Sequence, residues 1–280
     1  ASVSLPYFYA ISENKDFTFN PTIFYENTKM IQTEFRQKNK NSFLTADIGI
    51  SRDFKTTETN KKKNAYHLFS KLNKNLDFKG FNKSNLNFFI ERVNKDTYLK
   101  IFDSTLASDS IKPKNLDLLN SGFDFFPENN NYSLSGGANI FEDLTKNPND
   151  RYQYVFPYYN YSTSLLSDIK GDINFSSNGR NSLSNTNNFR SKITNTIDYN
   201  TKDIYSKKGF VNNFGIFLKN LNATGKNDEK YKSSIQSEIL NINEINTKMP
   251  MIKFNEKHIN YITPKMSFRI NPSDMKDSSS

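Results

Sequence analysis

The sequence predicts an all-β fold: an antiparallel transmembrane β-barrel, present here in part as about 13–14 strands of a larger barrel. Three observations predict it. Apolar and polar residues alternate with a period of two, which is the signature of strands with two different faces. Turn-forming residues separate these alternating segments, which run about ten residues each. Aromatic residues make up 14% of the chain and gather near segment ends, as in the girdles of membrane barrels.

The alternation is regular near both ends of the chain. From Phe17 to Ile23 the odd positions hold Phe, Pro and Ile, and the even positions hold Thr and Asn. From Leu44 to Ser51 the apolar residues take the even positions. From Ile262 to Ile270 the even positions are again apolar, whereas the odd positions hold Thr, Lys, Ser and Arg. Each segment therefore has one apolar and one polar face if it is a strand.

The same criteria place strands along the whole chain, joined by short turns and by longer connectors near 55–64, 104–114, 144–150 and 226–256. Residues 229–245 are ambiguous, because four isoleucines recur there in steps of four, three and three, as on a helix face. We expect an irregular loop or a poorly alternating strand there rather than a helix. The expected strands are 4–11, 16–26, 29–38, 42–54, 65–77, 84–94, 96–103, 115–126, 132–143, 151–165, 170–184, 187–204, 210–225 and 257–271.

Composition excludes some classes of protein and leaves a membrane barrel possible. Only 35% of the residues are hydrophobic, which is little for a soluble core of 280 residues. The high aromatic content argues against a disordered chain. No apolar run approaches the roughly 18 residues of a membrane-spanning helix. A secreted β-sandwich binding module would also alternate and stays an alternative.

The chain offers little for catalysis. It has no cysteine, and its two histidines, His67 and His258, stand outside any catalytic or metal motif. We expect His67 to face a lumen or the surface. The net charge of +9 comes from dispersed lysines in an A/T-rich codon background, so we do not expect nucleic-acid binding. We expect no enzyme activity, no catalytic residues, no cofactor and no metal.

Short motifs point to one family. Residues 5–12 read LPYFYAIS, residues 16–21 read DFTFNP and residues 34–36 read EFR. In this order and spacing they resemble the LptD family (also OstA or Imp) of lipopolysaccharide-assembly outer-membrane proteins, which has an LPYYW-like strand, a D-x-T-x-x-P strand and an E-[FY]-R strand. MPMI at 249–252 and ITPKMSF at 262–268 are similar to a later segment of that family. Tyr154 to Tyr161 resembles a mid-barrel strand, and the middle third matches only in alternation and turn placement.

The chain also departs from the family pattern. Tyr9 stands where Trp is common, Lys265 stands where Arg is common, and the cysteines of some members are absent. The periplasmic jellyroll that would precede Leu5 is missing, as are strands that would follow Pro272. We therefore expect residues 1–280 to be part of one barrel domain that cannot close alone, with open first and last strands.

The resemblance implies lipopolysaccharide transport and insertion into the outer leaflet of the outer membrane of a Gram-negative bacterium. It implies four partners: lipopolysaccharide, the plug lipoprotein LptE, the periplasmic bridge protein LptA and the barrel-assembly machinery. The alternative within the same architecture is an outer-membrane porin or receptor barrel.

Two sets of residues are candidate sites. Pro6 and Pro21 match prolines in the family's early strands and would weaken pairing at a lateral gate, because proline donates no ladder hydrogen bond. The alternative is that Pro6 only starts a strand and Pro21 only marks a bulge. The second set is charged and would face the lumen, where its basic members would attract an anionic cargo. The alternative is that the members of the set pair with each other as a solvated wall. It comprises Glu34, Arg36, Arg190, Lys192, Lys265 and Arg269.

Overall fold

The structure is a computed structural model that describes residues 2–25, 28–56, 59–103, 106, 111–165 and 170–273. Side chains are described for all of these except 53–56 and 59–63. The chain divides into two compact units, and each is treated separately below. Unit 1 comprises Ala1–Asn129, Ser135–Pro157 and Ser182–Asn187, and unit 2 comprises Asn130–Leu134, Tyr158–Asn181 and Asn188–Ser280.

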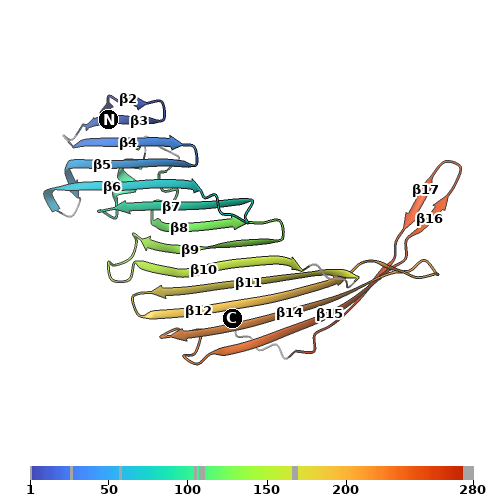
Figure 1. Cartoon of the computed structure of the whole chain (residues 1–280). Coiled ribbons are helices and arrows are strands. Elements are labelled where there is room, and N and C mark those ends of the chain that lie inside the picture. The colour runs from blue at the N-terminus through green and yellow to red at the C-terminus, as the bar shows by residue number, and fades with distance from the viewer. Residues whose placement is uncertain are drawn as a thin grey trace. The chain divides into compact units, whose positions relative to one another are not determined.

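The fold is all-β, as the alternation predicted, and strands that follow each other in sequence pair side by side (Figure 1). A 16-stranded sheet has the order β1-β3-β4-β5-β6-β7-β8-β9-β10-β11-β12-β14-β15-β18, with β2 also pairing with β3 and β13 with β14. Its strands are β1 Ser2–Ser4, β2 Tyr7–Ser12, β3 Lys15–Phe24, β4 Lys29–Asn39, β5 Ser42–Thr56, β6 Thr59–Asn75, β7 Lys83–Val93, β8 Leu118–Glu128, β9 Tyr132–Asp143, β10 Tyr152–Leu165, β11 Gly171–Ser184, β12 Asn188–Thr201, β13 Ile204–Tyr205, β14 Val211–Lys226, β15 Gln236–Lys248 and β18 Lys265–Ile270.

The sheet is open. Among the described residues, β1 and β2 pair only with β3, and β18 pairs only with β15. A separate two-stranded hairpin joins β16, Met251–Phe254, to β17, Ile259–Ile262. In the described part of the chain, no helix has the length and apolar character needed to cross a membrane.

The strand expected at 96–103 is wrong. Residues Tyr98–Phe102 form the short helix α1, whose side chains Tyr98, Leu99 and Phe102 are buried. Their spacing of one and four residues suits one helix face, whereas a strand would have sent Tyr98 and Leu99 to opposite faces. The segment between β7 and β8 therefore leaves the sheet and packs on it.

The expectations for the C-terminal third also need correction. The connector expected at 226–256 contains β15 and β16. Three of the four isoleucines, Ile239, Ile242 and Ile245, lie in a poorly alternating strand and not on a helix, and Ile235 directly precedes that strand. Pairing along thirteen positions of β14 outweighs their helical spacing. The single strand expected at 257–271 is two strands, β17 and β18, separated by Thr263 and Pro264.

Two smaller differences lie near the N-terminus. The strand expected at 4–11 is divided at Leu5 and Pro6 into β1 and β2, because Pro21, opposite Leu5 on β3, has no N–H to donate to the ladder. The connector expected at 55–64 is mostly strand, since β5 ends at Thr56 and β6 begins at Thr59. By contrast, the strand expected at 132–143 is β9 with the same bounds.

The core of unit 1 lies on the face of the sheet that the sequence marked as polar. The described residues of segment 94–117 (94–103, 106 and 111–117), with α1, cover this face over β4 to β6, and their apolar side chains contact the few apolar residues there. The buried cluster consists of Met30, Ala65, Phe69, Tyr98, Leu99, Phe102, Leu106, Ile111, Leu119 and Leu144.

Candidate functional site

The pairing register sorts the side chains of unit 1 into two faces. Thr18, Glu34, Asp47 and Phe69 occupy one row across β3, β4, β5 and β6, on what we call the polar face. Neighbouring rows on the opposite, apolar face carry Phe19, Ile31, Ile48, Ile50 and Tyr66, and several of these side chains are exposed. The two faces predicted from the alternation are thus aligned across neighbouring strands.

A buried polar network anchors segment 94–117 to the polar face. Gln32 Nε2 donates to Asp47 Oδ2 at 2.7 Å, and Asp47 Oδ1 lies 3.3 Å from His67 Nε2. His67 Nδ1 and the Tyr98 hydroxyl are 2.6 Å apart. His67, expected in a lumen or at the surface, is therefore buried beneath α1. A Cβ at Gly49, which faces His67 across the strands, would lie 2.3 Å from His67 Cε1, so only glycine leaves room for the ring.

The chemistry of this network is structural. The Tyr98–His67–Asp47 order resembles a proton relay, but all three side chains are almost fully buried. Burial, together with the nearby charge of Asp47, raises the pKa of Tyr98, so its hydroxyl stays protonated and can donate to His67. Because no substrate can reach these buried side chains, we infer that the network holds the described residues of segment 94–117 on the sheet.

A second anchor holds the start of the same segment. Arg151 binds Asp96 with two hydrogen bonds, of 3.0 and 3.1 Å, and its Nη1 lies 3.3 Å from Glu142 Oε1. Glu142 also accepts hydrogen bonds from Arg92, at 3.2 Å, and from the Tyr152 hydroxyl, at 2.9 Å. The hydrogen bond to Asp96 is the main cause that raises the pKa of Arg151. Segment 94–117 is thus fixed near Asp96 and at Tyr98.

Glu34 and Arg36 lie on the polar face next to this covered region. Arg36 Nε is 2.8 Å from Asp16 Oδ1 on the neighbouring strand β3 and 3.5 Å from Glu34 Oε1. Arg36 thus forms ion pairs with Glu34 on its own strand and with Asp16 on the next strand. The Arg36 guanidinium is half-exposed and keeps part of its surface free for solvent.

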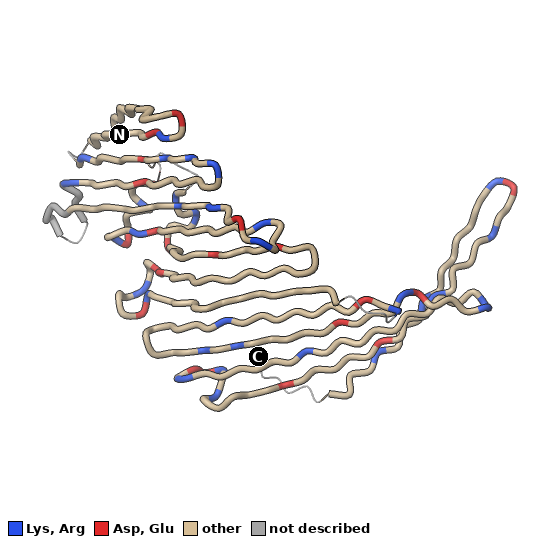
Figure 2. Tube along the Cα trace, viewed as in Figure 1, with Lys and Arg blue, Asp and Glu red and all other residues tan. Residues whose placement is uncertain are grey.

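In unit 2 the register places Arg190, Lys192, Lys265 and Arg269 on one face of the strands β12, β14, β15 and β18. Figure 2 shows basic and acidic positions interleaved along these strands rather than gathered into one basic stripe. Arg190 forms two hydrogen bonds with Asp228, of 2.9 and 3.1 Å, and its guanidinium carbon lies 5.3 Å from the centre of the Tyr231 ring. Arg190 therefore binds two residues, Asp228 and Tyr231, of the loop between β14 and β15.

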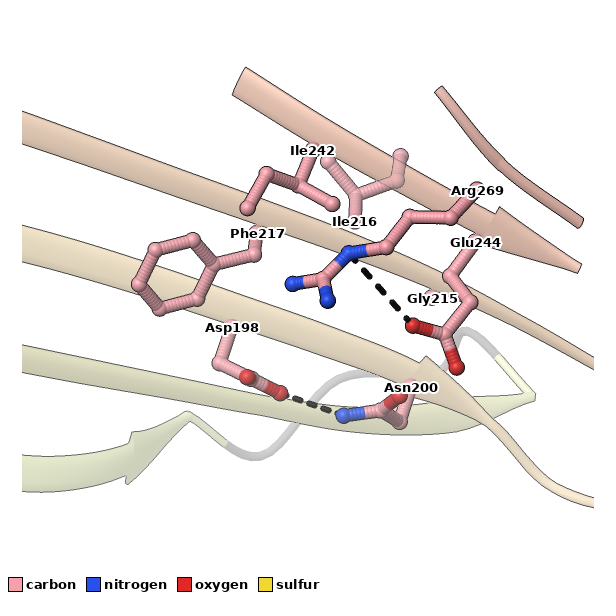
Figure 3. Close-up of a pocket in the computed structure, with 8 residues that line it drawn as sticks. All are labelled: Asp198, Asn200, Gly215, Ile216, Phe217, Ile242, Glu244 and Arg269. Atoms are coloured by element: carbon pink, nitrogen blue, oxygen red, sulfur yellow. Dashed lines mark hydrogen bonds and ion pairs between the residues drawn. The ribbon is translucent and has the colours of Figure 1, made fainter. Parts of the chain in front are cut away.

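Arg269 lines a pocket of about 220 Å³ on this face (Figure 3). Asn200, Gly215, Glu244 and Arg269 form one row across four strands. Gly215 lines this pocket, and a Cβ there would lie 2.9 Å from Asn200 Oδ1. Arg269 Nε is 3.9 Å from Glu244 Oε2, and the pocket is completed by Asp198, Ile216, Phe217 and Ile242.

The two candidate prolines lie close together where β1 and β2 meet β3. The pairs Ser4–Thr22 and Tyr7–Phe19 share one register, which sets Leu5 opposite Pro21 and Pro6 opposite Asn20. Leu5 N donates to Pro21 O at 3.2 Å, but Pro21 has no N–H for the return bond. The nitrogen of Pro6 points away from β3, so Pro6 costs this ladder no bond. Pro21 lies in regular pairing with β4, not at a bulge.

The same arrangement recurs near the other edge of the sheet, which the sequence analysis missed. One register runs from β15–β18 into β16–β17, setting Met249 opposite Pro264 and Pro250 opposite Thr263. Met249 N donates to Pro264 O at 3.1 Å, again without a return bond. The available signal was the repeated pattern of an X-Pro dipeptide followed fourteen to fifteen residues later by a lone proline.

Within the described ranges, no three His, Asp or Glu side chains gather closely enough to hold a metal ion. No protein-family model and no curated protein matches the chain.

Proposed function

We propose that this chain is part of an outer-membrane β-barrel of the LptD type, which inserts lipopolysaccharide into the outer leaflet of the outer membrane. One observation carries the proposal: the register holds apolar side chains on one face, and charged or polar side chains on the other, across successive strands of unit 1. Such a sheet suits a wall between lipid and water. The specific activity, lipopolysaccharide insertion, is proposed from the LptD-like motifs near both ends of the chain.

The strand lengths are compatible with this role. The strands from β3 to β12 run from 10 to 17 residues, and a tilted strand crosses a bilayer with about 9–11. The longer ones would extend past the membrane on one side. The partners in this role are lipopolysaccharide, the plug lipoprotein LptE, the bridge protein LptA and the barrel-assembly machinery.

The polar face would then line the lumen, and Pro6 and Pro21 would lie at the lateral exit. The missing return bond at Pro21 supports easier separation of β1 and β2 from β3. Lys265 and Arg269 are exposed to an anionic cargo, and Arg269 lies 3.9 Å from Glu244, whereas Arg36 and Arg190 contact carboxylates at 2.8 and 2.9 Å.

Depleting the full-length protein in its host tests the proposal. We expect newly made lipopolysaccharide to fail to reach the cell surface, while other barrel proteins still assemble. The readout is the fraction of lipopolysaccharide accessible to a surface-acting enzyme. Normal lipopolysaccharide display together with reduced uptake of small solutes would instead favour the porin or receptor alternative.

A variant series sharpens this test. Reversing the charges of Lys265 and Arg269 should lower export, because Lys265 is exposed and Arg269, 63% exposed, has only a distant contact of 3.9 Å with Glu244. The matched control reverses Arg36, which is held by Asp16. Equal export in all variants at equal protein levels would contradict a role for the charged face.

A further inference from the structure

The pocket beside Arg269 in unit 2 is lined by two neighbouring rows of side chains on one face of the sheet. Positions two apart on a strand point to the same face, so both rows face one space. Gly215 has no side chain and leaves the middle of its row open. One row comprises Asn200, Gly215, Glu244 and Arg269, and the other comprises Asp198, Phe217 and Ile242.

Two charged side chains of this pocket keep most of their hydrogen-bonding capacity. A guanidinium carries five N–H donors, and Arg269 donates none of them to a described residue. Its one ion-pair contact with a described residue is the distance of 3.9 Å from its Nε to Glu244 Oε2. Asp198 accepts a hydrogen bond from the Asn200 amide, and no cation among the described residues pairs with it. The pocket thus offers a cation and an anion to a ligand.

An apolar wall adjoins these charges. Phe217 and Ile242 lie in the row of Asp198, and Figure 3 shows the side chains of Asp198, Phe217 and Arg269 converging on one space. The volume of about 220 Å³ is smaller than the roughly 300–1,000 Å³ of sites for drug-sized ligands. It corresponds to about seven molecules of liquid water. The pocket therefore suits one small molecule with charges of both signs and an apolar part.

We propose that this pocket binds a free α-amino acid with an apolar side chain, such as leucine. The carboxylate of the ligand accepts hydrogen bonds from Arg269, because the guanidinium fork matches a carboxylate. The ammonium donates to Asp198, and the side chain lies on Phe217 and Ile242. A ligand with only one charge would leave the opposite charge of the pocket without a partner as water is displaced. The inference goes beyond the proposed function and does not rest on it.

Equilibrium dialysis with radiolabelled L-leucine measures the binding to the full chain, folded in neutral detergent. We expect saturation at one site with a dissociation constant of about 0.1 mM, as suits a ligand of about nine non-hydrogen atoms. Two analogues should compete about tenfold more weakly, because each lacks one charge. They are 4-methylpentanoate, which has no ammonium, and 3-methylbutylamine, which has no carboxylate.

Three substitutions test the assigned contacts. Asp198→Asn and Arg269→Gln each remove one charge, and each should lower the affinity about tenfold. Gly215→Ala changes no charge but fills the gap in its row, since its Cβ would lie 2.9 Å from Asn200 Oδ1. It should also weaken binding.

The matched controls remove charges from the same face of the same strands. Lys192→Gln on β12 lies six residues from Asp198, and Glu238→Gln on β15 lies six residues from Glu244. Six residues of strand span about 20 Å, so both controls should leave the affinity within about twofold. An equal loss in Asp198→Asn and in either control would overturn the site, because the effect would then follow net charge and not position.

Three other results would also overturn the inference. Binding of leucine that does not saturate would indicate partition into detergent. Equal affinity for 4-methylpentanoate would indicate a simple anion site at Arg269, and equal affinity for phosphoethanolamine would indicate a site for a zwitterionic lipid head group. These comparisons use the unchanged chain, so they test the site even if a variant fails to fold. Failure of the proposed function is seen separately, because it is read from lipopolysaccharide display and not from leucine binding.

Discussion

At the scale of single residues, the described part of unit 1 depends on a few buried polar contacts. The Tyr98 hydroxyl reaches His67, and His67 reaches Asp47, all beneath α1. The hydrogen bonds of this network join Tyr98 to His67 and Gln32 to Asp47, whereas His67 Nε2 and Asp47 Oδ1, 3.3 Å apart, form none. The order of these contacts explains how a helix of five residues is held on a polar sheet face.

Replacing Tyr98 by Phe should destabilise unit 1. The ring still packs against Phe102, but His67 Nδ1 loses its buried partner, which costs about 1–3 kcal/mol. Denaturant unfolding of the chain in detergent, followed by circular dichroism, measures this. Tyr25→Phe is the control, because Tyr25 is exposed. An equal free energy of unfolding for Tyr98→Phe and the parent chain would refute the anchoring role.

A second residue-scale prediction concerns pH and Asp228. The hydrogen bonds from Arg190 are the main cause that lowers the pKa of Asp228 in the folded chain. The folded state therefore favours the ionised carboxylate, and this stabilisation is present above the unfolded pKa of about 3.9. It disappears as the pH falls through the lower folded pKa.

The expected outcome for Asp228→Asn is a stability deficit on the order of 1 kcal/mol at neutral pH, because the partly exposed Arg190 loses its charged partner. The deficit should shrink toward zero as the pH falls through and below the pKa range of Asp228. Unfolding curves of both chains at several pH values provide the comparison. A deficit that stays constant down to pH 2 or so would show that charge is not the cause.

At the scale of elements, proline decides where strands pair weakly. Pro21 withholds a bond that would face Leu5, whereas the nitrogen of Pro6 faces the open edge. The sequence marked both prolines as gate candidates, but in the sheet only Pro21 removes a ladder hydrogen bond. The register of β1, β2 and β3 makes this difference.

Pro21→Ala should therefore strengthen the edge, and Pro6→Ala should not. The new N–H can donate to the Leu5 carbonyl, so exchange of the Leu5 and Tyr7 amides should slow by about two- to tenfold. Hydrogen exchange read by mass spectrometry or NMR tests this. If both variants slow exchange equally, the assignment of the missing bond to Pro21 is wrong. Under the proposed function, export should fall in Pro21→Ala more than in Pro6→Ala.

At the scale of the whole molecule, the sheet is open and keeps different side chains on its two faces. In unit 1 the apolar face is exposed at Ile31, Ile48 and Ile50, while the polar face is covered by segment 94–117. A soluble fold would be expected to bury its apolar face instead. This inversion is the physical basis for proposing a membrane location.

The substitution Ile48→Arg tests whether the apolar face of unit 1 lies in lipid. On a lipid-facing strand the change should lower insertion into bilayers by about 2–4 kcal/mol near the midplane. Thr18→Arg, on the polar face beside Glu34, should leave insertion nearly unchanged. Heat-modifiable gel mobility after folding into vesicles gives the inserted fraction. Equal insertion of the two variants would place the apolar face elsewhere than in lipid.

Much of the fold was predictable from sequence because alternation is a local property. Phe17, Phe19 and Ile23 fall on one face whatever the rest of the chain does, and residues 132–143 form the expected strand. The sequence by itself determined an all-β chain with sheet strands of two unlike faces and with prolines near its edges.

Only the tertiary structure decided what the faces touch. Tyr98 meets His67 across 31 positions of sequence, and that contact draws 96–103 into a helix on the sheet rather than a strand within it. The pairing register decides which residues form a row across neighbouring strands. It aligns Asn200, Gly215, Glu244 and Arg269 in one row and sets Lys248 opposite Lys265. Register depends on pairing between distant strands, and a shift of one residue would send every side chain to the other face.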